Sequence, residues 1–540
     1  MRKYGSITIR QLLLLLLITS LMTTAVGAAT GTVDISIVYQ ELEGFGGSGA
    51  FYENWLVGYP QTQENELYDI LFDELGLDIY RLRNTYNIDS SSTDYSAQIV
   101  AAAKLRNPMI KIMISSWSPP AYLKSNDNRR EGTLKKDAYG NYMYDEFADW
   151  WADGLADFAA HNIIADYVGI QNEPDFTTPD WDSCEFTPTE DPCAGYNLAF
   201  EAVYQELDSR MSELPKLLAP ETGGFGGSQA YIDALIDTNH AYGYAHHLYG
   251  DGSYSSPENF ITGMEDYAAD YGYKPLFQTE YSRNDDFTDA MYTARHIHNS
   301  LVYEGVCAYF YWDLFWGREE GEPNKGFVTL VHPWNYPYDY IINPTYYAFK
   351  QYSAFTDPGW SRVEASTDSG SLRICAFKSV DNTKLTIVII NIAAGGISLS
   401  LSLEDFSQTS SAVYRTSATE NTAYIGPFTE PGPLTLPARS ITTISLTGSS
   451  SPVFSNCAEA VAAGYSLTSD ISGDCYVNYE DIEIITSYWL SNRCGWPNNY
   501  CDGGDFEPKD SDVDFFDFST FASQWMQCND PEGAGCIENW

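Results

Sequence analysis

Positive charge is scarce in this sequence of 540 residues, and its scarcity excludes several classes of partner. Lys and Arg number 29 against 74 Asp and Glu, which gives a formal net charge of -45 at pH 7. A surface this acidic repels nucleic acid phosphates and anionic membranes over a long range. We therefore expect no nucleic acid partner, and a substrate that is uncharged or held by local contacts.

Two further features are missing beyond the N-terminal segment. No later apolar run approaches the roughly 20 residues of a transmembrane helix. No helix-like segment opens with a glycine-rich phosphate-binding fingerprint. The sequence thus predicts no membrane span, and it disfavours a doubly wound nucleotide-binding sheet as the fold.

The N-terminal segment, residues 1–29, is MRKYGSITIRQLLLLLLITSLMTTAVGAA. It has a basic start, a short apolar run from Leu12 to Leu17 and small residues at its end, as secretory signal peptides do. A membrane anchor is the alternative, but the apolar run is short for a stable span. We therefore expect a secreted, extracellular protein.

Cysteines of an exported chain can form disulfides, because extracellular conditions are oxidising. Six of the ten cysteines lie in the last part of this chain. These six allow several pairings, among which the sequence does not choose: Cys457, Cys475, Cys494, Cys501, Cys528 and Cys536. Cys184 and Cys193 flank the loop CEFTPTEDPC and are placed to close it. Cys307 and Cys375 lie in apolar strands, where we expect buried free thiols.

Residues 42–355 alternate short apolar runs with amphipathic segments. Counting LEGFGG as the first, eight runs end in polar or glycine-rich stretches; the other seven are LDIYRLRN, MIKIMISSW, YVGIQNEP, KLLAPETGG, YAHHLYG, KPLFQTE and VCAYFYWDLFW. Eight strands alternating with helices over about this length are typical of a (β/α)8 TIM barrel. The predicted fold class is α/β.

The periodicity changes to two over residues 356–448, most clearly in ISLSLSL, where apolar residues alternate with serine. This pattern predicts a β-sandwich side domain. Residues 30–41 alternate likewise and are predicted to be a strand of the same domain. Residues 449–456 are predicted to be a linker, and residues 457–540 a separate small domain. From residue 451 on there are 16 Asp and Glu but 2 Lys and Arg.

Two glutamates end predicted strands of the barrel, Glu173 in GIQNEPDF and Glu280 in LFQTE. Catalytic groups of such barrels lie at the carboxyl ends of the strands. Two facing carboxyl groups suit glycoside hydrolysis, because one protonates the leaving oxygen while the other attacks the anomeric carbon. The alternative is a structural Glu173 bonded to Arg81 or Arg83.

Seven motifs, taken in order, resemble those of glycoside hydrolase family 30, and in particular its xylanase branch. They are GFGG at 44–47, WSPPAYLK at 117–124, QNEPDF at 171–176, APE at 219–221, HLYG at 247–250, TEYS at 279–282 and DPGWSRVEAS at 357–366. The resemblance covers residues 33–448. It implies a (β/α)8 barrel with an attached β-sandwich and a retaining mechanism. Together with the predicted signal peptide, it leads us to expect a secreted retaining endo-β-1,4-xylanase with a xylan-like polysaccharide substrate and no cofactor for catalysis. The alternatives are another specificity of that family, namely a glucuronoxylanase, β-1,6-glucanase or β-glucosidase-like enzyme, or a non-catalytic carbohydrate-binding protein.

By the same resemblance, Glu173 is the general acid/base, Glu280 the nucleophile and Asn172 a ligand of the sugar 2-hydroxyl. Four residues resemble those lining the sugar subsites, although each has a packing role as its alternative: Trp117, His247, Tyr249 and Trp312. A cation bound by His246 and His247 together is disfavoured, because adjacent strand residues point to opposite faces.

The end of the eighth strand departs from the glucuronoxylan-specific subgroup, in which a pair of arginines clamps glucuronate. Here the stretch is YWDLFW at 311–316, and Arg318 follows beside Glu319 and Glu320. The sequence therefore predicts an enzyme that does not depend on glucuronate side chains.

The acidic tail contains the spacing of a calcium-binding loop. DISGDCYVNYED places oxygen ligands at loop positions 1, 3, 5, 7, 9 and 12: Asp470, Ser472, Asp474, the carbonyl of Tyr476, Asn478 and Asp481. A second copy aligns Asp510, Asp512, Asp514 and Asp517, with Asp505 one residue too far upstream. The duplication resembles an EF-hand-like dockerin type I module, although Cys475 replaces the usual Gly at position 6. The resemblance implies structural Ca²⁺ and a possible cohesin-type partner; an acidic solvated linker is the alternative.

Overall fold

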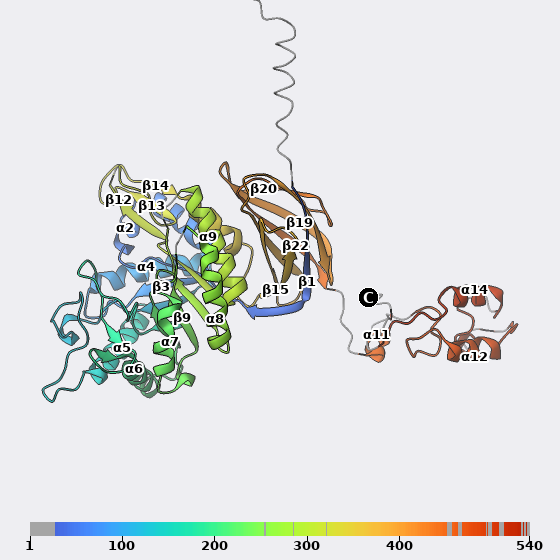
Figure 1. The fold of residues 1–540 in the computed structure, drawn as a ribbon, viewed down its shortest axis with the longest axis horizontal. Coiled ribbons are helices and arrows are strands. Elements are labelled where there is room, and N and C mark those ends of the chain that lie inside the picture. The colour runs from blue at the N-terminus through green and yellow to red at the C-terminus, as the bar shows by residue number, and fades with distance from the viewer. Residues whose placement is uncertain are drawn as a thin grey trace, which may run out of the picture. The chain divides into compact units, whose positions relative to one another are not determined.

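The protein divides into two compact units, Met1–Ser449 and Ser450–Trp540, each of which is described by itself (Figure 1). The computed structural model describes residues 27–252, 255–283, 286–319, 321–450, 456–462, 467–492, 494, 499–506, 512–530, 533 and 536. Most of the predicted signal peptide and most of the predicted linker lie outside these residues. Among the helices described, none has both the length and the apolarity needed to cross a bilayer.

Eight parallel strands close into a barrel in the first unit. In chain order they are β2 (Gly44–Ser48), β3 (Ile79–Arg83), β4 (Lys111–Ser115), β5 (Tyr167–Gly169), β8 (Lys216–Thr222), β9 (Gly243–His247), β10 (Leu276–Glu280) and β11 (Ala308–Trp312). These are the eight runs that the sequence marks as strands. The predicted (β/α)8 barrel with an attached β-rich domain is confirmed.

Glycine at the first strand lets the barrel interior close. A Cβ at Gly46 would lie 2.4 Å from the ring of Phe310, and one at Gly47 would lie 2.4 Å from Leu314. The lower barrel interior is filled by a small apolar cluster that includes Met113, Phe277 and Phe310. The barrel interior is therefore packed, and the cavity described below lies outside it, at the carboxyl ends of the strands.

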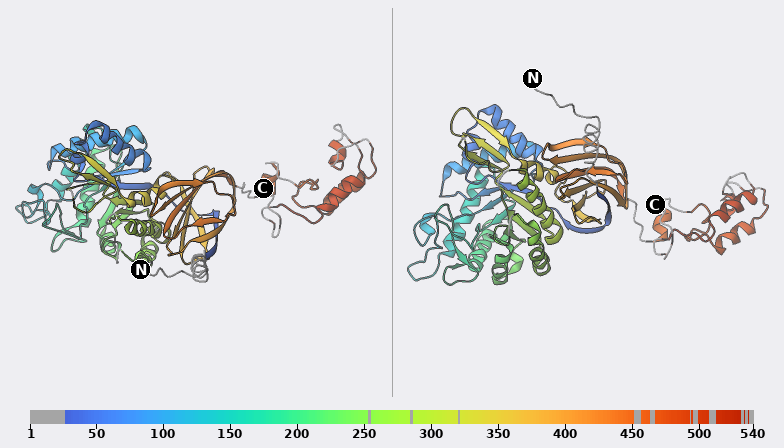
Figure 2. Two further views of the ribbon diagram at one scale, coloured as in Figure 1. Left: turned by 90° about the horizontal axis from the view of Figure 1, so that it is seen from above. Right: turned by 45° about the horizontal axis from the view of Figure 1, so that its top comes forward.

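Helices surround the barrel and bury one face against its strands (Figures 1 and 2). They are α2 (Glu53–Val57), α3 (Gln61–Asp69), α4 (Ser90–Arg106), α5 (Tyr144–Ala160), α6 (Tyr196–Arg210), α7 (Phe225–Ala234), α8 (Ile261–Tyr271), α9 (Phe287–Asn299) and α10 (Pro344–Ser353). Shorter 3-10 and π segments are Ile70–Glu74, Ala121–Leu123, Thr238–His240, Pro257–Phe260 and Ser300–Glu304. The helix α4 begins where the Asp89 carboxylate accepts the N–H of Ser91.

Two small sheets extend the loops at the carboxyl ends of the strands. One contains β12 (Phe315–Arg318), β13 (Val328–Val331) and β14 (Asp339–Ile342), inserted directly after β11. The other pairs β6 (Phe186–Thr187) with β7 (Ala194–Gly195). Both insertions follow strands whose ends carry candidate site residues.

The side domain is a nine-stranded sheet with strand order β20-β19-β22-β17-β16-β15-β1-β18-β21. Its strands are β1 (Gly27–Glu41), β15 (Ser361–Thr367), β16 (Leu372–Lys378), β17 (Lys384–Asn391), β18 (Ile397–Glu404), β19 (Phe406–Ser417), β20 (Glu420–Gly426), β21 (Leu434–Leu436) and β22 (Ser440–Ser450). Strands from both ends of this order, such as β19 and β21, contribute to one apolar core, so the sheet is curled around it.

The N-terminal strand β1 begins at Gly27 rather than at residue 30, and it pairs with two strands of the side domain. It is antiparallel to β15 and parallel to β18. The side domain therefore contains a parallel pair beside its antiparallel ones. Alternation gives the buried face of a strand but not the direction of its neighbour.

The predicted closure of the loop between Cys184 and Cys193 is wrong, because both cysteines are free. Cys184 is buried, and the loop is closed instead by the pairing of Phe186 with Ala194 in β6 and β7. Cys307 and Cys375 are buried free thiols, as expected.

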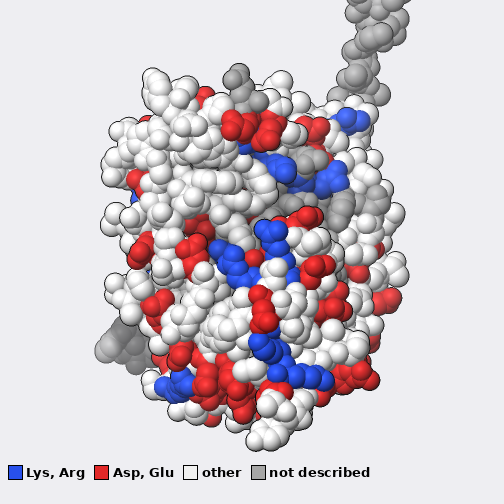
Figure 3. Space-filling model, turned by 90° about the vertical axis from the view of Figure 1, so that its left-hand side faces the viewer, with Lys and Arg blue, Asp and Glu red and all other residues white. Residues whose placement is uncertain are grey.

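The charges on the face of the body shown in Figure 3 are interspersed, with Lys and Arg beside Asp and Glu. Ion pairs on the surface of the first unit include Lys135–Asp127 at 2.6 Å and Arg106–Asp69 at 2.6 Å. Exposed pairs of this kind each stabilise by about 1 kcal/mol or less.

The second unit is small and is held by three disulfides, Cys457–Cys475, Cys494–Cys501 and Cys528–Cys536. Its helices are α11 (Cys457–Ala462), α12 (Tyr479–Ser487), α13 (Asn499–Asp502) and α14 (Phe515–Ser523). A compact core includes Val477, Ile485 and Phe521. Disulfides and a minimal core are typical of small extracellular modules.

Candidate active site

A cavity of about 910 Å³ lies at the carboxyl ends of the barrel strands and is lined by both predicted catalytic glutamates. Its lining is rich in aromatic and glycine residues: Phe51, Tyr52, Trp117, Glu173, Asp175, Phe176, Trp181, Gly223, Gly224, Gly226, Gly227, Tyr249, Gly250, Asp251, Glu280, Ser282, Trp312 and Trp316. We call this cavity the cleft. A cavity of this size with few convergent polar groups is typical of a ligand site.

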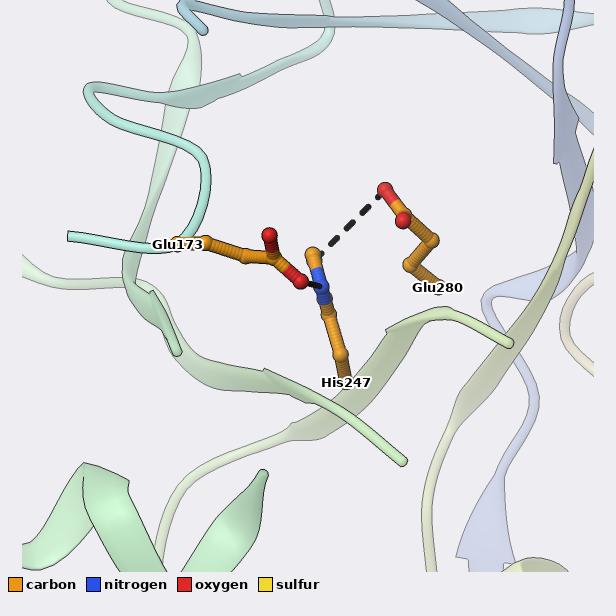
Figure 4. Close-up of side chains that lie close together, drawn as sticks. All are labelled: Glu173, His247 and Glu280. Carbon is orange, nitrogen blue, oxygen red and sulfur yellow. Dashed lines mark hydrogen bonds and ion pairs between the residues drawn. The ribbon is translucent and has the colours of Figure 1, made fainter. Parts of the chain in front are cut away.

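Glu173 and Glu280 face each other across the imidazole of His247 (Figure 4). One carboxylate oxygen of each glutamate and a ring nitrogen of His247 all lie within 4.8 Å of one another. The Nδ1 atom of His247 is 3.1 Å from Glu173 Oε1, and its Nε2 atom is 3.9 Å from Glu280 Oε2. The structure thus places in one group three residues that are far apart in the sequence.

Arg81, from the middle of β3, joins the glutamates to the barrel interior. Its guanidinium donates to Glu280 Oε2 at 2.6 Å, to Asn172 Oδ1 at 2.6 Å and to Glu221 Oε1 at 3.0 Å. Ser115 donates to both oxygens of Glu221. Since Arg81 and Glu221 are fully buried, this network fixes the positions of Glu280 and Asn172.

The backbone around Glu173 is held in an unusual conformation. Glu173 has φ +45° and Glu221 has φ +61°, in the left-handed region that non-glycine residues rarely adopt. The N–H of Glu173 donates to the carbonyl of Glu221 at 2.9 Å, and the N–H of Asn172 donates to the carbonyl of Ser116 at 2.7 Å. Backbone strain maintained by its surroundings is common at functional sites.

The carboxyl of Glu173 differs electrostatically from that of Glu280. Burial raises the pKa of Glu173 to about 7, and Arg81 offsets only part of that effect. Glu280 instead bonds directly to Arg81. Glu173 is therefore suited to carry a proton near neutral pH, whereas Glu280 has a cation to stabilise its charge.

The two adjacent histidines of β9 point to opposite sides, as the strand periodicity predicts. Burial lowers the pKa of His247 to about 3, so its ring is neutral beside Glu173. The ring of His246 points away and pairs with buried Glu304 at 2.5 Å, while its Nδ1 atom contacts the carbonyl of His247 at 2.7 Å. The contact between His246 and Glu304 therefore holds the end of β9, from which His247 reaches Glu173.

A cluster of aromatic rings lies next to Arg81 at the site. Trp117 and Trp312 lie with ring centroids 5.5 Å apart, and Phe51 is 5.5 Å from Trp117. The guanidinium of Arg81 lies 4.6 Å from the ring centroid of Trp117. Tyr249 also lines the cleft. All four predicted subsite residues are thus at the site, with His247 below the cleft surface rather than in its lining.

Basic side chains are absent from the lining of the cleft as far as the described residues go. Arg83 pairs with Asp182 at 3.1 Å, and Arg318 donates to the carbonyl of Glu319 at 3.0 Å. A neighbouring pocket of about 450 Å³ has Arg283 and Lys325 in its lining. Neither predicted structural partner of Glu173, Arg81 or Arg83, bonds to it among the contacts described.

Several site residues escaped the sequence analysis. Arg81 was considered only as a structural partner, although an arginine inside the apolar run LDIYRLRN is unusual enough to mark a buried polar network. Asp175 and Trp181 lie in the loop after Glu173, where no periodicity distinguishes them from other loop residues. Trp316 lies in the insertion after β11.

The first predicted calcium loop brings its carboxylates together in the tail. Oxygens of Asp470, Asp474 and Asp481 all lie within 4.8 Å of one another. The Asp470 side chain accepts the N–H groups of Gly473 and Cys475, at 2.8 and 2.9 Å. Burial raises the pKa of Asp470 above its ordinary value. The donor set is the all-oxygen set that Ca²⁺ prefers.

Cys475 occupies the loop position at which calcium loops usually have glycine, and its backbone explains why. Its φ is +65°, the left-handed conformation that glycine adopts without strain. The disulfide to Cys457 ties this residue to α11. The loop therefore keeps its sharp turn at position 6 with a cysteine in place of glycine.

The second loop repeats the first at its downstream end. Asn478 and Asp481 form a capping box at α12, and Asp514 and Asp517 form the same box at α14. Asp510 lies outside the described residues, while Asp512, Asp514 and Asp517 lie within them.

The position of Asp505 differs from the expectation. The N–H of Phe506 donates to Asp517 Oδ1 at 3.0 Å, just as the N–H of Ile471 donates to Asp481 Oδ1 at 2.8 Å. Despite the extra residue, the backbone directly after Asp505 therefore makes the same contact as the backbone directly after Asp470. Spacing alone could not show where the loop accommodates that residue.

Comparison with known proteins shows that the chain is similar to glycoside hydrolases. The chain is 25% identical over 418 residues to the glucuronoxylanase XynC of Bacillus subtilis (strain 168), covering 74% of this chain and 86% of that one. The catalytic domain of GH30 xylanase C from Talaromyces cellulolyticus has the same fold with a TM-score of 0.63 at 21% identity, covering 77% of this chain and 100% of that one. The endo-beta1,6-glucanase BT3312 superimposes with a TM-score of 0.61 at 18% identity, covering 78% and 96%. No family model matches the chain.

These relatives are glycoside hydrolases, and the prediction that the chain is an enzyme of this class is confirmed at that level. Two structural neighbours whose names give different substrates, a xylanase and a β-1,6-glucanase, have nearly equal TM-scores. Fold similarity therefore does not choose the substrate.

Proposed function

We propose that the protein is a secreted retaining endo-β-1,4-xylanase. The observation that carries the proposal is the arrangement of Glu173 and Glu280, with carboxylate oxygens within 4.8 Å of each other. Retaining glycosidases separate their two carboxyl groups by roughly 5 to 5.5 Å, whereas inverting enzymes leave roughly 6.5 to 9.5 Å for a water molecule. Carboxylate oxygens this close to each other favour the shorter class.

In the first step, Glu173 protonates the glycosidic oxygen while Glu280 attacks the anomeric carbon. A pKa of about 7 keeps Glu173 protonated below neutral pH. Arg81, at 2.6 Å from Glu280, stabilises the attacking carboxylate and orients it. The products are a glycosyl ester on Glu280 and the released leaving sugar.

In the second step, Glu173 acts as a base. Having lost its proton, it takes one from a water molecule that attacks the ester, so the anomeric configuration is retained and both glutamates return to their starting states. The neutral ring of His247 contacts Glu173 in both steps without adding a charge. The side-chain oxygen of Asn172 accepts a hydrogen bond from Arg81. The side-chain N–H groups of Asn172 are therefore oriented to donate to the sugar 2-hydroxyl.

Xylan is the substrate class favoured by the sequence motifs and by the names of two of the three relatives reported above. The test is product analysis after incubation with glucuronoxylan, arabinoxylan, undecorated xylooligosaccharides and β-1,6-glucan. We expect internal cleavage of the three xylan substrates. Cleavage of β-1,6-glucan alone would replace the xylanase proposal with the alternative specificity.

Independence from glucuronate is part of the proposal, because the described cleft lining has no Lys or Arg. Enzymatic removal of glucuronate from xylan should change the rate less than about twofold and leave the product lengths unchanged. A strong loss of activity would contradict this. In that case Lys325→Ala would test the neighbouring pocket, since Arg283 is already bound by Asp289 at 2.6 Å.

A second function is proposed for the tail, namely calcium binding by a dockerin-like module with a possible cohesin-type partner. The first loop would hold the ion through Asp470, Ser472, Asp474, Tyr476, Asn478 and Asp481. The close approach of three of these carboxylates supports the proposal. Binding of a labelled cohesin panel with and without calcium tests it, and calcium-independent binding would contradict it.

A further inference from the structure

The cleft has two unlike halves on either side of the carboxyl pair. The half beside Glu280 contains Arg81 and the rings of Trp117 and Trp312. The half beside Glu173 is built from two other segments, the loop after Glu173 and the residues Gly223–Gly227. A Cβ at Gly223 would lie 3.8 Å from Glu173 Oε1, so this second half begins directly at the acid.

The floor of the second half is a peptide surface without protruding side chains. Gly223, Gly224, Gly226 and Gly227 all line the cleft. The carboxylate of Asp251 accepts the N–H groups of Phe225 and Gly226 at 2.8 and 2.9 Å, at the start of α7. A Cβ at Gly224 would lie 2.3 Å from that carboxylate. The floor is therefore both flat and fixed.

The wall of the second half is a pair of aromatic rings. Phe176 and Trp181 are 45% and 46% exposed, and their ring centroids are 6.3 Å apart. The loop that carries them is closed by Ser183, whose hydroxyl accepts the N–H of Thr178 and donates to the carbonyl of Thr178. Exposed aromatic rings that line a cleft on a hydrogen-bonded loop are suited to stacking on a sugar ring.

Asp175 lies between the floor and the wall. Its Oδ1 atom accepts the N–H of Gly223 at 3.0 Å, which fixes the carboxylate. Its Oδ2 atom lies 3.0 Å from where a Cβ of Gly227 would be. The carboxylate of Asp175 therefore lines the cleft at the edge of the glycine floor.

We infer that the glycine floor, the rings of Phe176 and Trp181 and the carboxylate of Asp175 form the subsite for the leaving sugar. The inference rests on the proposed function, because the acid Glu173 must contact the oxygen that joins the cleaved sugar to its leaving group. The sugar on that side of the acid lies over Gly223 and within reach of Asp175. Asp175 accepts a hydrogen bond from one of its hydroxyls.

The ligand of this subsite is an uncharged pyranose. Glu173, Asp175 and Asp251 all line this half, and the described lining contains no Lys or Arg to balance a further negative charge. A sugar carrying a uronic acid is disfavoured here by like-charge repulsion. Cleavage should therefore leave decorated residues away from the first position of the leaving fragment.

The test compares two substrates that differ only in the leaving group, xylotetraose and 4-nitrophenyl β-xylobioside. Asp175→Ala and Trp181→Ala should each reduce kcat/KM on xylotetraose by about tenfold, as expected for the loss of a hydrogen bond or of a stacking contact. On the nitrophenyl substrate, whose leaving group makes few of these contacts, the loss should be less than about twofold. Asp175→Asn keeps an acceptor for Gly223 and separates a folding defect from a binding defect.

Matched controls lie close by. Asp180, in the same loop, and Trp334, which is 40% exposed, are both outside the lining of the cleft. Asp180→Ala and Trp334→Ala should leave both rates unchanged. Thermal unfolding of each variant checks that the loop remains folded.

Three results would overturn the inference. Equal losses on both substrates would show that Asp175 and Trp181 act on Glu173 or on the fold, and no loss on either would place the leaving sugar elsewhere. If the unaltered protein cleaves neither substrate, the proposed xylanase function fails and the subsite fails with it. A selective loss on xylotetraose supports both.

Discussion

The described residues include two groups of close-lying carboxylates that differ in how their charge is balanced. In the cleft, Glu173 and Glu280 share the imidazole of His247, and in the tail Asp470, Asp474 and Asp481 meet directly; within each group the ligand atoms lie within 4.8 Å of one another. The cleft cluster includes a buried cation, because Arg81 bonds to Glu280 at 2.6 Å. The described tail residues include no Lys or Arg at all.

The difference separates two uses of the same side chains. In the cleft, the carboxyl of Glu280 bonds to Arg81, while burial raises the pKa of the Glu173 carboxyl to about 7, so that Glu173 can carry the proton. In the tail, backbone N–H groups bind several carboxylate oxygens, yet like charges remain in contact. We interpret the first cluster as built for proton transfer and the second as built for a cation.

The largest effect should come from removing the carboxylate of Glu280. Glu280→Gln keeps an acceptor for Arg81 but not the nucleophile, so turnover should fall by more than the ~10²–10⁴-fold that loss of a general acid costs. The measurement is the initial rate on xylooligosaccharides and on an activated aryl glycoside. The thermal midpoint should change little. Undiminished hydrolysis of either substrate would remove Glu280 from its proposed role.

Removing the acid should have a smaller effect that depends on the substrate. Glu173→Gln should slow cleavage between sugars by ~10²–10⁴-fold, because the leaving oxygen then departs without a proton. An aryl glycoside with an activated leaving group needs little protonation, so formation of its glycosyl ester should be nearly unaffected. A burst of released phenol measures that step. The same loss on both substrates would contradict the assignment of Glu173 as the acid.

The pH dependence of the unaltered enzyme reports the raised pKa of Glu173. The folded pKa of about 7 lies above the ordinary value of 4.5, so Glu173 is protonated below about pH 7 and loses its proton above it. Since the protonated form is the acid, kcat/KM should fall by about tenfold per pH unit on the alkaline side. This alkaline limb should be absent in Glu173→Gln. A limb that persists in the variant would belong to another group.

Much of the barrel could be predicted from the sequence because its strands are short apolar runs with polar ends. Because catalytic groups lie at those ends, Glu173 and Glu280 could be chosen as candidates before any distance between them was known. The partners of these residues could not be predicted in the same way. Whether Arg81 bonds to Glu173 or to Glu280 depends on side-chain geometry inside the barrel, where several acceptors are within reach.

Two further features depend on backbone contacts of the same kind. Cys184 and Cys193 are near in sequence, but the backbone pairing of β6 and β7 closes the loop without them. In the second calcium loop, Asp505 lies one residue farther upstream than Asp470 does in the first, yet the N–H of Phe506 donates to Asp517 as that of Ile471 donates to Asp481. In both cases hydrogen bonds of the backbone, which spacing does not reveal, decide the outcome.

The smallest effect on catalysis should come from chelating calcium, which nevertheless sharpens the comparison most. Without a cation, repulsion among Asp470, Asp474 and Asp481 should loosen the tail and expose it to proteases. Hydrolysis should be unchanged, because the proposed acid and nucleophile are both side chains of the barrel. The measurement is the rate of proteolysis within residues 457–540, with and without chelator, beside the rate of xylan hydrolysis.

Matched variants distinguish binding from general acidity. Asp481→Asn should weaken calcium binding by at least about tenfold in a calorimetric titration, because it removes charge from the loop position that is usually bidentate. Glu483→Ala removes an exposed carboxylate two residues later and should leave the affinity unchanged. The disulfides are able to mask loosening, so the proteolysis is repeated after mild reduction. Equal protease resistance with and without calcium under both conditions would leave the tail as a disulfide-held acidic module, and the two clusters would then differ in surroundings but not in their need for a cation.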